Sequence, residues 1–267
     1  MILDETYELL KSYYDIRFDK LALSDVRIGL YLTAVRLSDG SCGVASTLAE
    51  NKIHCDKESR DYGEFTPSKI KGRRVIDLFE TAKISNVTDT LKIAVLNAVS
   101  SRMISDSAYK IIENADPVDL IPLTEPKTIT IVGGFHSYIR RFSNTNNRLY
   151  VLELNEDNLA DEHKKFYIPA ADYEKILPAS DIIIITGFTL VNNTIDNLLA
   201  KIPSKSQVIV TGPSSSIIPD ILFGYGVDII GATRITDPDM LFAIVGEAGA
   251  GFHLFRYCAL KICILNE

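Results

Sequence analysis

The sequence lacks the segments that would direct a chain into or across a membrane. No stretch offers the ~18 uncharged apolar residues that a transmembrane helix needs. The first fifteen residues, MILDETYELLKSYYD, carry acids and have neither the basic start nor the apolar run of a signal peptide. Their spacing predicts an amphipathic helix over residues 1–18, and a cytoplasmic protein is the expectation.

Cysteine is scarce, and its spacing excludes the common disulfide and zinc patterns. The four cysteines are Cys42, Cys55, Cys258 and Cys263. They form no CxxC pair, and a disulfide framework is not expected. Cys258 and Cys263 fall in an apolar tail, which predicts buried thiols.

Runs of basic residues are also missing. Lysine and arginine number 28 against 35 acids, which gives a net charge of −7. Without a basic stripe, neither a nucleic-acid partner nor a basic membrane-surface helix is expected. Hydrophobic residues make up 46% of the chain, which is enough to build a folded core.

The first part of the chain predicts an α+β domain over residues 1–120. VRIGLYLTAVRL and SCGVASTLA flank Ser38-Asp39-Gly40, and Asp-Gly between two strand-like runs is a hairpin signal. Residues 51–72 are polar and irregular, and two helices are expected from VIDLFETA and TDTLKIAVLNAVSSRMI. Residues 113–128 contain three prolines and several acids, which is typical of a linker.

The pattern changes over residues 121–267. Strand-like runs, TITIVGGF, RLYVLELN, DIIIITGFTL, QVIVTGP and VDIIGATRIT, alternate with helix-like segments, and DPDMLFAIVGEAG is the last expected helix. None of the strands alternates apolar and polar residues. Strands that are apolar on both faces belong to a parallel sheet covered on both sides. The second domain is therefore predicted to be a Rossmann-like open parallel α/β sheet.

Ligands of such sheets bind beyond the carboxyl ends of the strands. Here those ends are rich in glycine, hydroxyl, amide and carboxylate groups, which favours a ligand-binding role. The candidate ligand-binding residues are Gly133, Gly134, Glu153, Thr186, Gly187, Asn192, Thr194, Gly212, Pro213, Ser214 and Ser215.

One spacing among these residues resembles half of a dinucleotide fingerprint. Gly133-Gly134 should open a helix after a strand, and Glu153 follows 19 residues after Gly134 at the next strand end. However, Tyr138 stands where a third glycine belongs. A tight turn beside a surface glutamate is the alternative.

Two polar loops have a structural alternative as well. One asparagine of Asn192-Asn193 could cap a helix beginning near Ile195, and a serine after Pro213 could cap a helix that follows at once. Capping would leave the other hydroxyls and amides free for an oxygen-rich ligand.

The remaining candidates are isolated residues. His136 lies near a strand end and is the candidate acid–base group or metal ligand, and a solvent-facing histidine is the alternative. Glu153 and Glu247 are the other candidate metal ligands. Asn97, in the helix predicted for the first domain, either makes an internal hydrogen bond or faces the ligand from the opposite side.

Several segments resemble a family described as "putative heavy-metal chelation", of the DUF364 type. They are DIIIITGFTLVNNTIDNLL, VIVTGPSSSIIPDILFGYG and VGEAGAGF, and the first half is similar to the family's companion DUF4213-type domain at Gly43-Val44-Ala45 and Leu96-Asn97-Ala98. The resemblance implies an enolase N-terminal-like domain, a Rossmann-like domain and a site in the cleft between them.

Three hypotheses for the function remain open. The first is binding of a small anionic or chelating metabolite in the interdomain cleft, with or without a transition metal ion. The second is an enzyme that uses a nucleotide-type cofactor on the Rossmann-like half, with His136 as the acid or base. The third is a scaffold or homodimer module whose glycines only form turns.

Overall fold

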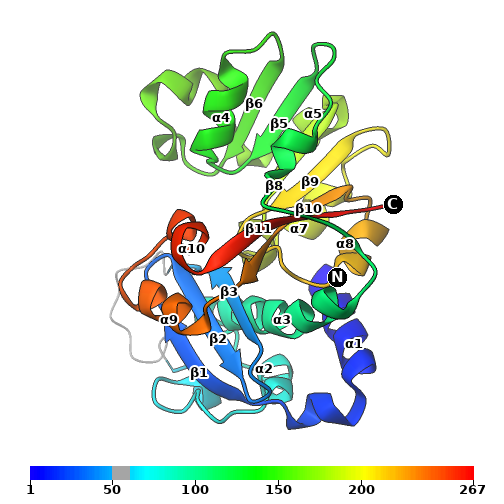
Figure 1. The fold of residues 1–267 in the computed structure, drawn as a ribbon. Coiled ribbons are helices and arrows are strands. Elements are labelled where there is room, and N and C mark those ends of the chain that lie inside the picture. The colour runs from blue at the N-terminus through cyan, green and yellow to red at the C-terminus, as the bar shows by residue number, and fades with distance from the viewer. Residues whose placement is uncertain (50–60) are drawn as a thin grey trace.

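The computed structural model describes residues 1–49 and 61–267 and contains two sheets (Figure 1). The small sheet has the order β1-β2-β3, and the large one has the order β4-β11-β10-β9-β8-β5-β6-β7. The predicted fold class is confirmed, because a small N-terminal sheet precedes an eight-stranded, mostly parallel sheet flanked by helices. The proposed division at residues 120 and 121 stays a prediction.

The N-terminal part consists of three antiparallel strands and the helices that pack on them. Its elements are α1 (Ile2–Tyr14), β1 (Leu23–Ile28), β2 (Leu32–Leu37), β3 (Cys42–Ser46), α2 (Val75–Glu80) and α3 (Asn86–Asp106). The predicted hairpin is confirmed, since β2 and β3 pair around Gly40, which adopts a φ of 87°. The region predicted to be irregular, 51–72, lies in part outside the described residues; beyond residue 60 it contains a short 3-10 turn, Gly63–Phe65.

One predicted strand of this part is in fact two. The run from Val26 to Leu37 turns back at Gly29, so that β1 and β2 form an antiparallel pair. A Cβ at Gly29 would overlap the main-chain oxygen of Val245, in α9. The turn is therefore placed by packing against a distant helix, which the local sequence does not reveal.

Helix α3 is the central element of the N-terminal part. Ser85 caps it by accepting a hydrogen bond from the main-chain nitrogen of Thr88 at 3.1 Å. Twelve of its residues are buried, and Gly43 of β3 allows the helix to approach closely. A Cβ at Gly43 would overlap main-chain atoms of Ala94 and Ala98.

The large sheet has six parallel strands. They are β5 (Thr128–Val132), β6 (Arg148–Glu153), β7 (Tyr167–Pro169), β8 (Ile182–Thr186), β9 (Gln207–Thr211) and β10 (Ile229–Ile235). Numbered along the chain, they have the spatial order 3-2-1-4-5-6 of a Rossmann sheet. Their order reverses between β5 and β8.

Two antiparallel strands extend this sheet and were not predicted. β11 (Ala259–Leu265) pairs with β10, and β4 (Lys110–Glu113) pairs with β11. A short segment of the first half of the chain is thus part of the large sheet.

Short helices connect the strands of the large sheet. They are α4 (His136–Ser143), α5 (Tyr173–Ile176), α6 (Phe188–Val191), α7 (Ile195–Leu199), α8 (Pro219–Gly224), α9 (Pro238–Gly246) and α10 (Gly251–Tyr257). The prediction of a helix directly after Pro213 is wrong, because α8 begins only at Pro219. This proline occupies the first turn of the helix.

The last helices return to the N-terminal sheet. Leu241, Phe242 and Val245 of α9 form one buried cluster with Leu32 and Ala34 of β2. Figure 1 shows α9 and α10 beside β1–β3. No helix within residues 1–49 and 61–267 is long and apolar enough to cross a membrane.

Candidate functional site

A cavity of about 570 Å³ lies where β5, β6 and β8 end, at the reversal of strand order. Ligands of open α/β sheets bind at this position. The candidates Gly133, Gly134, Glu153, Thr186, Asn192 and Thr194 all line it. Six residues that the sequence placed at separate strand ends and loops therefore share one cavity.

The β5–α4 turn forms one wall of the cavity. Gly133 has a φ of 104°, a conformation that favours glycine, and a Cβ there would lie 2.9 Å from Cγ2 of Thr186. The glycine therefore allows the turn to pass directly over the end of β8. The helix that follows has no side-chain cap at its first turn.

Glu153, the last residue of β6, faces this turn. Its Oε1 accepts hydrogen bonds from the main-chain nitrogen of Leu154 at 2.8 Å and from Nδ2 of Asn158 at 3.1 Å. Its Oε2 lies 3.4 Å from the position of a Cβ on Gly134. One carboxylate oxygen is thus fixed by the protein, while the other points to the glycine turn and accepts no hydrogen bond from the described residues.

The loop after α6 forms the opposite wall. Oδ1 of Asn192 accepts from the main-chain nitrogen and the hydroxyl of Thr194, at 3.3 and 2.7 Å. Asn193 has a φ of 57°, an uncommon conformation for a residue other than glycine. The expectation that an asparagine caps α7 is wrong, because Thr194 is the N-cap residue and no side chain caps the helix.

The sequence analysis missed the apolar part of the lining. Leu154, Tyr173, Phe188 and Leu198 line the cavity, together with Ala170 and Ala171. They come from loops and short helices, and no polar or glycine signal marks these side chains, although Phe188 and Leu198 lie within the segment DIIIITGFTLVNNTIDNLL. Their presence makes the cavity suitable for a ligand with a flat or apolar portion beside its polar groups.

The Gly212-Pro213 loop belongs to the contact between the two parts of the chain. Ser214 and Ser215 are fully buried and bonded inside the protein. Oγ of Ser214 accepts from the main-chain nitrogen of Ser46 at 2.8 Å, and Oγ of Ser215 donates to the main-chain oxygen of Gly231 at 2.7 Å. These two hydroxyls stabilise the loop and do not line the cavity at β5, β6 and β8.

Gly187 and Asn97 also lie at this contact. A Cβ on Gly187 would lie 2.9 Å from the main-chain nitrogen of Ser215, so the loops after β8 and β9 touch. Nδ2 of Asn97 donates to the main-chain oxygens of Val44 at 2.8 Å and Pro213 at 3.2 Å. Asn97 therefore joins the two parts of the chain rather than two helices.

Two family models match this chain, one in each half. A model described as "Putative heavy-metal chelation", DUF364, matches residues 116–264, and a second with the same description, DUF4213, matches residues 11–100. The chain belongs to the DUF364 family. The resemblance stated from the sequence motifs is thereby confirmed.

One further sequence and two DUF364 structures match this chain over nearly its whole length. An uncharacterized protein of Methanocaldococcus jannaschii is 25% identical over 271 residues, which cover 98% of this chain and 96% of that protein. A DUF364 protein of unknown function from Pyrococcus horikoshii has a TM-score of 0.79 at 24% identity, with 100% of both chains covered. One from Desulfitobacterium hafniense has a TM-score of 0.71 at 17% identity, covering 97% and 98% of the two chains. These structural likenesses show the fold.

The family description raises the question of a metal site. A tight transition-metal site needs several histidine, cysteine or carboxylate ligands at one place. Within residues 1–49 and 61–267, no three such side chains are grouped so that they could hold an ion. The candidates His136, Glu153 and Glu247 therefore do not form a metal site together; His136 and Glu247 are exposed, and neither lines the cavity.

Proposed function

We propose that this DUF364 protein binds a nucleoside-type ligand in the cavity at the ends of β5, β6 and β8. The observation that carries the proposal is the position of Glu153, whose Oε2 faces the Gly133-Gly134 turn at the point where strand order reverses. A carboxylate at the end of the second strand accepts hydrogen bonds from ribose hydroxyls in Rossmann sheets.

The rest of the cavity complements such a ligand. Its volume, about 570 Å³, falls within the range of small-molecule sites. Leu154, Ala170 and Ala171 lie near Glu153 in the lining and offer apolar contact for a base. Asn192 and Thr194 add polar groups on the far side.

The first turn of α4 favours a nucleoside or a nucleoside monophosphate over a dinucleotide. In the dinucleotide fingerprint, the third glycine lets the helix pack close to the sheet beside the diphosphate. Here Tyr138 occupies that position, is only 8% exposed and donates a hydrogen bond to Oδ1 of Asp116 at 2.7 Å. The tyrosine ring fills space that close packing of the helix would require.

This proposal takes its ligand class and its place on the Rossmann-like half from the second hypothesis drawn from the sequence, without the enzymatic role. The alternative of an anionic or chelating metabolite held by the Ser214 loop receives less support, because those hydroxyls already have internal partners. A carboxylate that recognises sugar hydroxyls needs no metal ion. This agrees with the cavity lining, in which Glu153 is the one metal-ligating type of side chain among the described residues.

Calorimetric titration with adenosine, guanosine, their monophosphates and the matching 2′,3′-dideoxynucleosides tests the proposal. The wild-type protein should bind at least one ribonucleoside about tenfold or more tightly than its dideoxy counterpart, since one good hydrogen-bonded contact is worth about 1.5 kcal/mol or more. Glu153→Ala should remove that difference.

The matched control is Glu156→Ala, which deletes an exposed carboxylate three residues away in the turn after β6. It should bind like the wild type. The proposal is wrong if the wild-type protein binds neither series, or binds ribose and dideoxyribose forms equally. A protein that binds none of these compounds would favour the scaffold hypothesis.

A further inference from the structure

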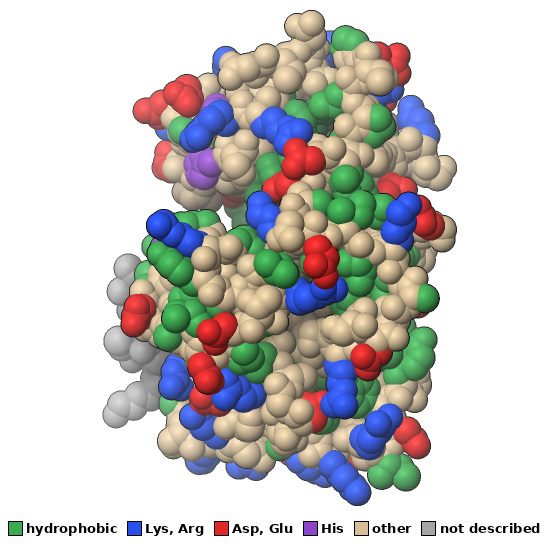
Figure 2. Space-filling model, viewed as in Figure 1, with side chains coloured by type: hydrophobic (Ala, Val, Ile, Leu, Met, Phe, Trp, Pro, Cys, Tyr) green, Lys and Arg blue, Asp and Glu red, His purple; other side chains and the backbone are tan. Residues whose placement is uncertain are grey.

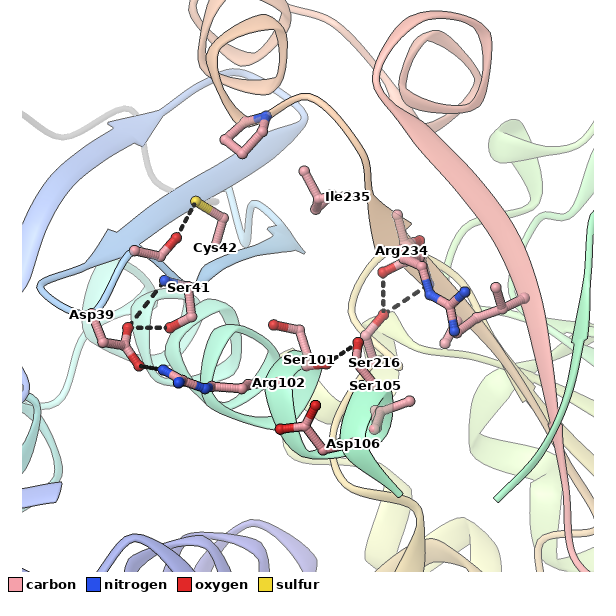
Figure 3. A pocket seen from close by; sticks show the side chains of 16 residues that line it. Asp39, Ser41, Cys42, Ser101, Arg102, Ser105, Asp106, Ser216, Arg234 and Ile235 are labelled. Atoms are coloured by element: carbon pink, nitrogen blue, oxygen red, sulfur yellow. Dashed lines mark hydrogen bonds and ion pairs between the residues drawn. The ribbon is translucent and has the colours of Figure 1, made fainter. Parts of the chain in front are cut away.

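Two more cavities lie around the C-terminal half of α3, apart from the cavity at the ends of β5, β6 and β8, and Figure 3 shows the first of them. The first, of about 410 Å³, lies between the β2–β3 turn, α3 and β10, and we name it the hydroxyl cavity after Ser41, Ser101, Ser105 and Ser216. The second, of about 480 Å³, lies between the end of α1 and α3, and we name it the tyrosine cavity after Tyr13, Tyr14 and Tyr109.

The two cavities meet at one wall of charged residues. Asp39, Arg102 and Asp106 line both of them. Figure 3 shows Arg102 reaching from α3 towards Asp39 in the β2–β3 turn, with Asp106 further along the same helix. A ligand at this wall would contact both cavities.

The charges at this wall are incompletely paired. The Arg102 guanidinium forms an ion pair with Asp39 at 3.6 Å and makes no side-chain hydrogen bond within the described part of the chain. Oδ1 of Asp39 instead accepts from the main-chain nitrogen and the hydroxyl of Ser41, at 3.0 and 2.7 Å. Asp106 has neither an ion pair nor a hydrogen bond among residues 1–49 and 61–267.

Arg102 and Asp106 are four residues apart on α3, so they lie on the same face of the helix. They do not pair with each other within 4.0 Å. Five guanidinium donors and a free carboxylate are thus displayed side by side where the two cavities join. Among the described residues the Asp106 carboxylate has no charged partner, and the Arg102 guanidinium, which is 59% exposed, keeps donors free beside its ion pair with Asp39. The two charges together complement a ligand that itself carries both signs.

We infer that the junction is a binding site for a free α-amino acid. Its carboxylate would take the Arg102 donors, and its ammonium group would lie against Asp106 and the outer oxygen of Asp39. A purely anionic ligand would be repelled by Asp106, and a purely cationic one by Arg102, whereas an amino acid matches both charges.

The hydroxyl cavity is less suited to the side chain of this amino acid. The hydroxyls of Ser101 and Ser105 already donate to main-chain oxygens one turn back on α3, at 2.8 and 2.9 Å, and that of Ser41 donates to Asp39. These groups therefore offer mainly acceptors. The tyrosine cavity also contains Leu21, Met103 and Ile218, so a large apolar or aromatic side chain would be buried there.

Calorimetric titration of the full-length protein with phenylalanine, tyrosine, leucine and methionine tests the inference. Each amino acid is compared with the amine that lacks its carboxylate and the acid that lacks its ammonium group, such as phenethylamine and phenylpropionate. The best amino acid should bind at least tenfold more tightly than either fragment.

The variants separate the two charges. Arg102→Gln should bind the amino acid no better than the amine, and Asp106→Asn should bind it no better than the acid. Arg140→Gln and Asp161→Asn, which alter exposed charges outside both cavities, should behave like the wild type. Nucleoside binding should be unchanged in all four variants, which keeps this site distinct from the Glu153 site.

Two results would overturn the inference. One is the absence of binding by any of the four amino acids to a folded wild-type protein. The other is an amine that binds as tightly as its amino acid and is lost only in Asp106→Asn, which would indicate a site for cations.

Discussion

The side-chain nitrogen of Asn97 donates a hydrogen bond to the main-chain oxygen of Pro213 over 3.2 Å, although 116 residues separate them in the chain. The same nitrogen donates to Val44 at 2.8 Å, so one buried amide joins α3, β3 and the loop after β9. Oγ of Ser214 accepts from Ser46 at 2.8 Å and forms a second link. The two parts of the chain are therefore joined by specific hydrogen bonds as well as by apolar packing.

Replacing Asn97 should weaken this contact. Asn97→Leu leaves the oxygens of Val44 and Pro213 without their donor in a buried place, which should lower the free energy of unfolding by about 2 kcal/mol. Urea denaturation followed by circular dichroism measures the change. Asp106→Ala, at an exposed position of the same helix, should cost less than about 0.5 kcal/mol, and an equal loss for both variants would contradict the argument.

Adding a methyl group at Gly43 should be more damaging. In Gly43→Ala, the new Cβ overlaps main-chain atoms of Ala94 and Ala98, which cannot move without shifting α3 away from β3. A loss of more than about 2 kcal/mol is expected, because overpacking against backbone is relieved only by displacing whole elements. Gly246→Ala is the control, since no other described residue outside its own helix turn comes within 4 Å of its Cβ position; thermal unfolding of the two variants should differ clearly.

The carboxylate of Asp116 should make stability depend on pH in acid. Burial alone would raise the pKa of Asp116, but hydrogen bonds from Lys261 at 2.7 Å and from Tyr138 at 2.7 Å outweigh it and lower that pKa. A lowered pKa in the folded state contributes stability above the unfolded value of about 3.9, and this contribution is lost as the pH falls through the folded value.

Urea midpoints measured between pH 2 and pH 7 check this expectation. The midpoint of the wild-type protein should fall more steeply below about pH 4 than that of Asp116→Asn, which has no group to protonate there. Asp119→Asn, at an exposed carboxylate of the same segment, should keep the wild-type slope. Parallel curves for wild type and Asp116→Asn would refute the assignment.

The described thiols should be unreactive in the folded protein. Burial raises the pKa of Cys258 to about 11 and that of Cys263 to about 12, and it also raises the pKa of Cys42. Thiolates are the reactive form, so little reaction with Ellman's reagent is expected at pH 8. Because Cys55 lies outside the described residues, the test uses Cys55→Ser.

In that variant, the three remaining thiols should react within seconds after denaturation and only slowly before it. Four cysteines less the one replaced gives the expected count of three. The buried positions of Cys258 and Cys263 agree with the expectation from the sequence. Rapid reaction of the folded variant would show that one of these thiols is accessible.

Most of the large sheet could be predicted from the sequence because its strands are apolar on both faces. Ile182 to Ile185 are all buried, so the run has no alternation and is recognised as a central parallel strand. β11 was read as an apolar tail, since nothing local shows that Ala259–Leu265 pairs antiparallel to β10. β4 and β7, with four and three residues, are too short to show a pattern.

The residues of the site, like the strands, could be predicted where the sequence signal is local and could not where it depends on distant contacts. Gly133, Glu153 and Thr186 could be placed together because the carboxyl ends of parallel strands meet at one edge. The role of Ser214 could not be predicted, because its partner, Ser46, depends on how the two parts of the chain pack. That of Ser215 could not be predicted either, because its partner Gly231 lies in the neighbouring strand β10, 16 residues further along the chain. The charged wall of Arg102 and Asp106 was missed because neither residue belongs to a motif.

The surface offers no simpler clue to the ligands. On the face shown in Figure 2, Lys and Arg side chains are interspersed with Asp and Glu, and neither sign forms a band. Recognition by this DUF364 protein is therefore better sought in its cavities than in a charged face.

The pairing of β4 has a consequence for how the protein is made. Among residues 1–49 and 61–267, β4 pairs with β11 alone, so residues 110–113 have no described strand to join until residues 259–265 have left the ribosome. The six parallel strands can associate before residues 259–265 are made, whereas this edge of the sheet can form only afterwards. Closing the edge should therefore follow the association of the parallel strands, and residues 110–113 are fixed in the sheet only then.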